Sequence, residues 1–205
     1  MLAAAGASRD EMNVKRFPAS EAHRLDDPSR RVWLPPAEVI AALSLRPEDT
    51  IADVGAGTGY FSLPLAQAVG PKGKVFAVDA QLDMLSLLRK KLNESSVSNV
   101  ELIHAEAEST TLPDGCCGLA FLANVWHEFA DRSVVLEESC RILKLGGRIA
   151  ILDWRPDVER EAGPPLDHRL AASDAADRLL SNGFHQVTIV NVGRYSWLVQ
   201  GEKLA

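Results

Sequence analysis

The stretch IADVGAGTGYFSLPLAQAVG, residues 51–70, decides the fold, because it sets three glycines at alternate positions between a short apolar run and a predicted helix. Each such glycine lowers local stability by roughly 0.5–1 kcal/mol where alanine would serve. Gly55, Gly57 and Gly59 therefore indicate a loop whose backbone something approaches closely. A bound ligand would explain the pattern, and a tight turn without functional consequence is the alternative.

The composition is that of an ordinary globular chain. Its 205 residues, 46% of them hydrophobic and 24% charged, fit one domain with a substantial core. The net charge of −6 argues against nucleic-acid binding, which usually requires a basic face. No apolar run approaches the ~20 residues of a membrane span, and residues 1–17 lack the pattern of a signal peptide. We expect a cytoplasmic protein that binds neither membranes nor nucleic acid.

The cysteines predict neither a disulfide framework nor a metal site. Cys116, Cys117 and Cys140 are odd in number, two of them are adjacent, and no CxxC pair occurs. Three free thiols agree with a reducing, intracellular setting.

The chain divides into an N-terminal arm, residues 1–34, and a folded domain, residues 35–205. The arm carries six basic and five acidic residues and few apolar ones. Beyond it, strand patterns alternate with helical ones. Strands are predicted over residues 50–55, 74–80, 99–107, 117–125, 147–154, 185–193 and 195–202, and helices over 34–43, 60–69, 81–94, 131–147 and 173–184.

Local signals place one helix with particular clarity. Asp131 is expected as the N-cap of the helix over 131–147, and Gly146 is expected just past its end.

The alternation predicts the topology of the sheet. Strands that alternate with helices of about ten residues pair in parallel through right-handed crossovers, with helices on both faces. The last two strands are joined by a tight turn at Gly193 and must be antiparallel to each other. We predict an α/β fold, a Rossmann-like, doubly wound, seven-stranded sheet that is mostly parallel with one antiparallel strand near the C-terminus.

The glycine loop is expected at the ligand crevice of such a sheet, beyond the carboxyl ends of the strands. The dinucleotide fingerprint G-x-G-x-x-G needs a third glycine at position 60, where Tyr60 stands. Asp79 follows Gly59 by 20 residues and can accept hydrogen bonds from both hydroxyls of a ribose. These residues favour a nucleoside ligand. An NAD-dependent oxidoreductase and a non-catalytic nucleoside-binding protein remain open.

Five motifs together make the sequence resemble the class I S-adenosylmethionine-dependent methyltransferases, in particular the small branch related to the ubiquinone/menaquinone-biosynthesis enzymes. They are DVGAGTG, AVDAQLDML, HAEAESTTLPDG, ANVWHEF and LKLGGRIAILDW, in the order and spacing of that family over roughly residues 35–200. The resemblance implies S-adenosylmethionine as cofactor, S-adenosylhomocysteine as product, and a small-molecule acceptor that the sequence does not identify.

The resemblance also implies roles for individual residues. The carboxylate of Asp53 would steady the glycine loop and reach the amino group of the cofactor's methionine part, and Asp79 would bind the ribose hydroxyls. Glu106 would accept from the adenine amino group, with Glu108 as a competing acid. Asn124 would line the sulfonium. The complete set of implied cofactor-binding residues is Asp53, Gly55, Ala56, Gly57, Gly59, Asp79, Ala80, Met84, Glu106, Ala107 and Asn124.

His127 is the candidate general base, because imidazole can take a proton near neutral pH. A structural histidine that caps a loop is the alternative. Glu128 is a second candidate, and Asp153 and Trp154 are expected in the acceptor pocket.

The acceptor pocket could be closed in several ways. The arm, with His23, Arg24 and Trp33, could fold over it as a lid, the loop that contains His168 could contribute, or a second subunit of a homodimer could complete it. The adjacent thiols of Cys116 and Cys117 also invite comparison with arsenite methyltransferases, whose cysteines hold the metalloid, although buried structural thiols explain them as well.

Overall fold

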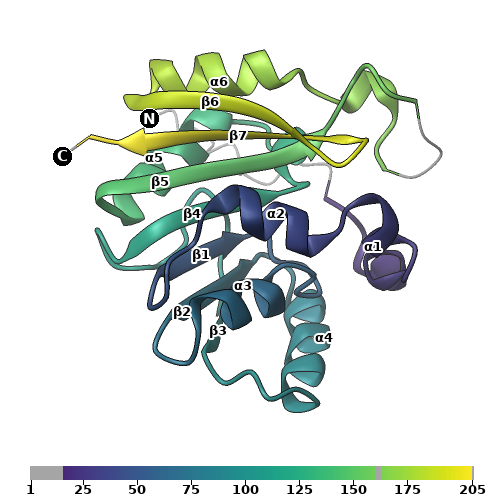
Figure 1. Cartoon of the computed structure of the whole chain (residues 1–205). Coiled ribbons are helices and arrows are strands. Elements are labelled where there is room, and N and C mark those ends of the chain that lie inside the picture. The colour runs from purple at the N-terminus through teal and green to yellow at the C-terminus, as the bar shows by residue number, and fades with distance from the viewer. Residues whose placement is uncertain (1–15, 160–162, 205) are drawn as a thin grey trace, which may run out of the picture.

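The protein forms a single sheet covered by helices on both faces in a computed structural model that describes residues 16–159 and 163–204 (Figure 1). The first 15 residues of the predicted arm lie outside the described residues, and with them most of the stretch tested for a signal peptide. Residues 160–162, in the loop before His168, and residue 205 also lie outside them.

Seven strands form the sheet in the order β3-β2-β1-β4-β5-β7-β6. Their bounds are β1 Thr50–Val54, β2 Lys74–Asp79, β3 Val100–His104, β4 Cys117–Ala123, β5 Leu143–Trp154, β6 Phe184–Val192 and β7 Ser196–Lys203. The first five strands pair in parallel, and β7 runs antiparallel to both of its neighbours, β5 and β6. The predicted fold class is confirmed.

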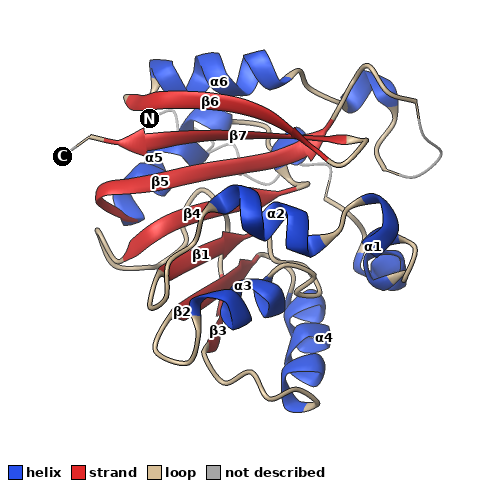
Figure 2. Ribbon diagram, viewed as in Figure 1, coloured by secondary structure: helices blue, strands red, loops and turns tan. Residues whose placement is uncertain are grey.

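Helices cover both faces of the sheet because successive residues of the central strands are apolar and point to opposite faces. Ile51 packs into one buried cluster with α2 and α3, whereas its neighbour Ala52 packs into the other with α5 and α6. Leu88 of α4 contributes to the first face through Ala77. The helix bounds are α1 Arg30–Trp33, α2 Pro36–Leu43, α3 Ser62–Val69, α4 Leu82–Asn93, α5 Arg132–Ile142 and α6 Ala172–Ser181. Figure 2 shows these two layers around the strands.

The helix predicted over 131–147 is too long by five residues. Asp131 caps its start as expected, since its side chain accepts hydrogen bonds from the backbone of Ser133 and Val134. The helix ends at Ile142, and Leu143 begins β5 by pairing with Cys117. Gly146, expected past the helix end, therefore lies within the strand. Burial of the Leu143 side chain in the sheet outweighs continuation of the helix.

Three short 3₁₀ helices and the one-turn helix α1 are absent from the sequence-based prediction. They are η2 Ala19–Asp26, η3 Trp126–Glu128 and η4 Leu166–His168. The strands predicted over 99–107 and 117–125 end earlier, at His104 and Ala123, so the residues that follow them are free to form loops. All four short helices lie near the carboxyl ends of the strands, where they contribute residues to a cavity described below.

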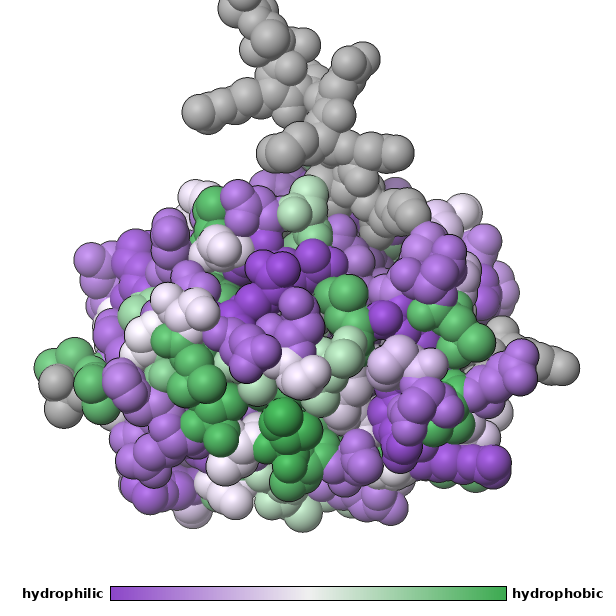
Figure 3. All heavy atoms as spheres, turned by 90° about the horizontal axis from the view of Figure 1, so that it is seen from above, coloured by the Kyte–Doolittle hydropathy of each residue, from purple (hydrophilic) through white to green (hydrophobic). Residues whose placement is uncertain are grey.

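One edge of the sheet is exposed at β6. Ile189 and Val190 on this strand are 49% and 44% exposed. Figure 3, which views the molecule from the side of α6 and β6, shows apolar residues dispersed among hydrophilic ones. Within the described residues, no helix combines the length and the apolar character that crossing a membrane requires.

Candidate functional site

A large cavity lies where the strand order reverses, between β1 and β4, at the carboxyl ends of the strands. Its volume is about 370 Å³, and the glycine loop, the ends of β1, β2, β4 and β5, and residues of the arm line it. A smaller cavity of about 70 Å³ adjoins it. The two cavities share Arg16, Gly55, Asp79, Gln81, Val125 and Glu128.

The glycine loop is held against the end of β2. The N–H groups of Gly55 and Ala56 both donate to the carbonyl of Val78, at 2.8 and 3.0 Å. Gly55 has φ +75°, and a Cβ placed on it would lie 2.6 Å from Cγ1 of Val125. Gly59 has φ +82°, and its Cβ would lie 2.2 Å from Cδ1 of Leu88. Gly55 therefore shapes the wall of the cavity, whereas Gly59 allows the loop to pack on α4.

Asp79 closes β2 and organises the loop around itself. Oδ2 accepts the N–H of Gly57 at 2.7 Å, and Oδ1 accepts the N–H of Gln81 at 2.8 Å. Burial raises the pKa of Asp79, although these two hydrogen bonds oppose the shift. A carboxylate has about four lone-pair positions, so each oxygen retains capacity for a hydroxyl donor from a ligand.

Asp53 lies deeper, at the floor of the same cavity. It is 2% exposed, and its Oδ2 accepts the hydroxyl of Ser62, in the first turn of α3, at 2.6 Å. Burial, with a smaller contribution from the charge of Asp79, raises the pKa of Asp53 to about 7. A cationic group bound nearby would be attracted to its ionised form.

Asn124 supplies the strongest sign that the cavity is built for a ligand. It follows β4 with φ +58°, and its backbone N–H donates to Leu152 at 2.7 Å. Its side-chain Oδ1 and Nδ2 are buried, line the cavity and have no hydrogen-bond partner among the described residues. An unsatisfied buried amide is costly. The orphaned amide and the glycine cradle therefore fit a polar ligand lying along the loop.

His127, which lines the same cavity, forms a hydrogen-bonded pair with Asp153. Nδ1 of His127 lies 2.9 Å from Oδ1 of Asp153, and the backbone N–H of His127 donates to Oδ2 at 2.9 Å. Burial lowers the pKa of His127, but the charge and hydrogen bond of Asp153 and the charge of Glu128 outweigh it, so the net shift is upward. A carboxylate partner makes Nδ1 the donor and leaves the Nε2 lone pair available.

Glu128 adds a second titratable group near neutral pH. Burial raises its pKa to about 7 against the opposing charge of His127. One of its oxygens accepts the backbone N–H of Phe17 at 3.3 Å, so this carboxyl group also holds the arm.

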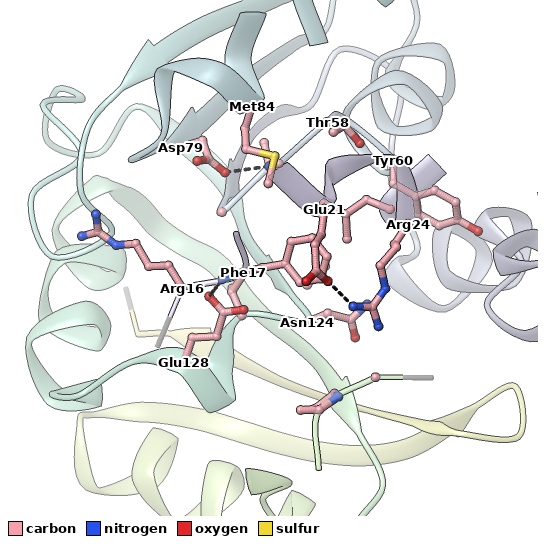
Figure 4. A pocket seen from close by; sticks show the side chains of 18 of the residues that line it. Arg16, Phe17, Glu21, Arg24, Thr58, Tyr60, Asp79, Met84, Asn124 and Glu128 are labelled. Atoms are coloured by element: carbon pink, nitrogen blue, oxygen red, sulfur yellow. Dashed lines mark hydrogen bonds and ion pairs between the residues drawn. The ribbon is translucent and has the colours of Figure 1, made fainter. Parts of the chain in front are cut away.

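The arm crosses the cavity and is fastened on both sides of it. The Phe17 carbonyl accepts Nε2 of Gln81 at 2.9 Å, while its N–H reaches Glu128 on the other wall. Figure 4 shows Phe17 between Asp79 and Glu128. Further along the arm, Asp26 accepts the hydroxyl of Thr58 at 2.8 Å.

Aromatic side chains form the rest of the enclosure. Trp33 of the arm and Trp154 at the end of β5 lie with ring centroids 5.0 Å apart. Tyr60 donates its hydroxyl to the carbonyl of Leu34 at 2.6 Å. These rings and Phe17 give the cavity an apolar lining beside its polar groups.

The structure brings nearly all the sequence-predicted site residues to the two cavities. The larger one is lined by Asp53, Gly55, Ala56, Gly57, Asp79, Met84, Asn124 and His127, and the smaller one by Gly55, Asp79, Ala80, Glu106 and Ala107. Gly59 lines neither, because it packs on Leu88.

Among the further candidates, Glu128, Trp154, Arg24, Trp33 and His168 line the larger cavity, and Asp153 reaches it through His127. Glu106 is paired with Arg16 at 2.6 Å, and Glu108 lines the smaller cavity.

Two candidates lie elsewhere. His23 is exposed and lines neither cavity. Cys116 and Cys117, with sulfur atoms 3.4 Å apart, stand at the start of β4, whereas the cavity is at its other end. The comparison with metalloid-binding thiols at the acceptor site is therefore wrong, because a strand of seven residues separates the thiols from the site.

Several cavity residues escaped the sequence analysis. Phe17, Gln81 and Arg30 line the cavity, and their local sequence pattern does not predict this position.

Comparisons with known proteins agree with the geometry. A family model described as a methyltransferase domain matches residues 52–151. The ubiquinone/menaquinone biosynthesis C-methyltransferase UbiE of Francisella tularensis subsp. novicida is 35% identical over 133 residues, which cover 62% of this chain and 51% of that protein. The demethylmenaquinone methyltransferase of Listeria welshimeri is 32% identical over 116 residues, covering 57% and 49%. The chain thus spans about half the length of the curated relatives it matches.

A solved structure matches over much more of the chain. The crystal structure of an S-adenosylmethionine-dependent methyltransferase from Aquifex aeolicus has a TM-score of 0.87 and 33% identity, covering 92% of this chain and 100% of that one. These matches give no support to an oxidoreductase or to a non-catalytic nucleoside-binding protein. With the predicted motifs, fold and cavity all present, the chain belongs to the class I S-adenosylmethionine-dependent methyltransferases related to the ubiquinone/menaquinone-biosynthesis enzymes.

Proposed function

We propose that the protein transfers the methyl group of S-adenosylmethionine to a small-molecule acceptor and releases S-adenosylhomocysteine. The observation that carries this proposal is the orphaned amide of Asn124. It lies in one cavity with the buried acids Asp53 and Asp79 and with His127, the partner of Asp153.

Named residues would hold the cofactor along the loop. Asp79 retains acceptor capacity for ribose hydroxyls, and the smaller cavity with Ala80, Glu106 and Ala107 would take the adenine. Asp53 and Asn124 would face the amino group and the sulfonium. Desolvation raises the pKa of Asp53 to about 7, and a cation bound nearby would stabilise the ionised carboxylate.

The chain's own task in the reaction is to orient the acceptor and to move a proton. S-adenosylmethionine, when bound, supplies a methyl carbon already activated on a sulfonium. Positioning of reactants can contribute up to ~7–11 kcal/mol to such a step. We propose His127 as general base, because Asp153 fixes Nδ1 as the donor and leaves Nε2 to accept the acceptor's proton.

The acceptor is proposed to be a small planar compound methylated on carbon. Trp33 and Trp154 give the cavity flat apolar walls, which suit an aromatic ring. One relative named above is a ubiquinone/menaquinone biosynthesis C-methyltransferase, and another is a demethylmenaquinone methyltransferase. Methylation of a ring carbon that bears hydrogen requires loss of a proton, and this requirement agrees with a base beside the cavity.

Residues 1–34 are proposed as a lid on a methyltransferase domain of residues 35–205. Phe17 and Trp33 line the cavity, and Asp26 fastens the same segment to the glycine loop. In this proposal the arm itself closes the site, and a second subunit is not needed for closure.

Calorimetric titration tests the cofactor assignment. We expect S-adenosylmethionine and S-adenosylhomocysteine to bind with micromolar dissociation constants and NAD to bind far more weakly. Asp79→Asn should weaken binding about tenfold or more, because a charged hydrogen-bond acceptor is lost, whereas Asp83→Asn on the exposed side of α4 should leave it unchanged. Tight binding of NAD alone, or equal affinities in the two variants, would contradict the proposal.

Turnover tests the catalytic assignment. A screen of small phenolic and quinone-like acceptors with methyl-labelled cofactor should find a substrate. His127→Gln should then reduce kcat by about 10²-fold or more, whereas His185→Gln, on exposed β6, should not. Undiminished kcat in the His127 variant would remove this residue from the mechanism and leave the binding assignment intact.

A further inference from the structure

Arg30 carries a buried charge that forms no ion pair with any acidic side chain of the described residues. Its side chain is 7% exposed and lines the larger cavity. Its guanidinium lies over the ring of Tyr60, 4.0 Å from the centroid, and donates one hydrogen bond of 3.0 Å to the carbonyl of Leu25. Nε is buried without a hydrogen-bond partner, and the guanidinium makes no ion pair within residues 16–159 and 163–204.

The other two arginines of the cavity wall are neutralised. Arg16 pairs with Glu106, and Arg24 pairs with Glu21. Burial lowers the pKa of Arg30 to about 10, so its guanidinium is still charged at neutral pH. Asp26, the carboxylate whose charge acts on Arg30, is engaged instead by Thr58 and Lys91. Buried charges are normally paired, and among the described residues Arg30 has no anionic partner.

We propose that Arg30 binds the α-carboxylate at the methionine end of S-adenosylmethionine, an inference that rests on the function proposed above. A guanidinium can bind a carboxylate through two parallel hydrogen bonds, and the orphaned Nε is one of the donors that such a pair uses.

The position of Arg30 in the cavity supports this end of the ligand. Asp79, expected to bind ribose, and Tyr60, over which Arg30 lies, stand on opposite sides of the cavity in Figure 4. Asp53 and Asn124 also line the cavity, as the acid and amide proposed for the amino group and sulfonium. A ligand whose ribose is at Asp79 and whose sulfur is near Asn124 would direct its remaining polar end toward Tyr60 and Arg30.

The test compares S-adenosylmethionine with decarboxylated S-adenosylmethionine, which lacks only the carboxylate. Titration calorimetry would measure both dissociation constants for the wild-type chain, for Arg30→Met, and for Arg30→Gln, which removes the charge but keeps a polar hydrogen-bond donor. Arg31→Met is the matched control, because it removes the same charge from the neighbouring, exposed position.

We expect the wild-type chain and Arg31→Met to bind S-adenosylmethionine at least about tenfold more tightly than the decarboxylated compound. In both Arg30 variants the ratio should fall to about threefold or less, mainly through weaker binding of S-adenosylmethionine. An unchanged ratio in either folded Arg30 variant would overturn the inference, and so would a wild-type chain that binds both compounds equally. Failure of the wild-type chain to bind either compound would instead refute the proposed function.

Discussion

Replacing Gly55 by alanine tests whether the glycine loop is shaped by contact with the end of β4. The new Cβ would meet two obstacles: a backbone at φ +75° and the Val125 side chain, whose Cγ1 would be 2.6 Å away. Gly183→Ala is the control, because φ is +82° there and no heavy atom of the described residues lies within 4 Å of the Cβ position. The pair of variants separates steric contact from backbone strain.

The two effects have different sizes. A left-handed conformation costs a non-glycine residue about 1–2 kcal/mol, and the less flexible unfolded chain returns about 0.4–1 kcal/mol. Gly183→Ala should therefore lower the free energy of unfolding by about 1 kcal/mol. Forcing a methyl group into packed surroundings adds about 1–3 kcal/mol, so Gly55→Ala should lower it by about 2–4 kcal/mol.

Urea denaturation followed by circular dichroism measures both variants, with Val125→Ala and the double variant completing a cycle. Val125→Ala removes the two atoms closest to the new Cβ. The loss of unfolding free energy in the double variant should therefore be smaller, by at least about 1 kcal/mol, than the sum of the losses in the two single variants. Equal destabilisation by Gly55→Ala and Gly183→Ala, or strict additivity in the cycle, would refute the contact as the reason for the glycine.

Three further predictions concern charge. The pKa of Asp53 is about 7 in the folded protein against 3.8 in the unfolded chain, so folding favours the protonated acid. As the pH rises from about 4 to about 7, the free energy of unfolding of the wild type should therefore fall relative to that of Asp53→Asn. Urea titrations at several pH values measure this difference. Asp153→Asn should lower the pKa of His127, measured by NMR titration, and an unchanged pKa would argue against the pair. Arg16→Met should change the unfolding free energy by less than about 1 kcal/mol, because its ion pair with Glu106 is exposed; a larger loss in urea would contradict this.

The fold could be predicted from the sequence because its determinants are local and repeated. The periodicity of its own residues predicts each strand and helix, and the lengths of the connections predict parallel pairing. The error at the end of α5 shows the limit. Gly146 is a valid local stop signal, but pairing of Leu143 with Cys117, 26 residues earlier in the chain, decides where the helix ends.

The glycines and the acids at strand ends were also predictable, because topology alone brings the carboxyl ends of neighbouring parallel strands together. Asp53 and Asp79 needed only the strand order to be placed at one crevice. The role of each glycine within the loop was not predictable, since it depends on distant side chains. Gly55 faces Val125 and Gly59 faces Leu88, and these partners are set by packing.

A lid over the site was among the expectations for the arm, but its individual contacts were not predictable, because they too depend on distant residues. Its contacts join residues separated by long stretches of chain: Phe17 reaches Gln81 and Glu128, which lie 64 and 111 positions away. Such contacts leave no period in the sequence, and most of the arm's groups are polar, so composition alone favours a loose segment. Residues 16–34 are held by such hydrogen bonds, by the buried side chains of Leu34 and Arg30 and by the contact of Trp33 with Trp154. If Arg30 is completed by the cofactor, the arm is most stable when the site is filled, because a ligand that binds one state better shifts the protein toward that state. Closure of the site and binding of the cofactor are then a single coupled equilibrium, and the residues that couple them share no local sequence pattern.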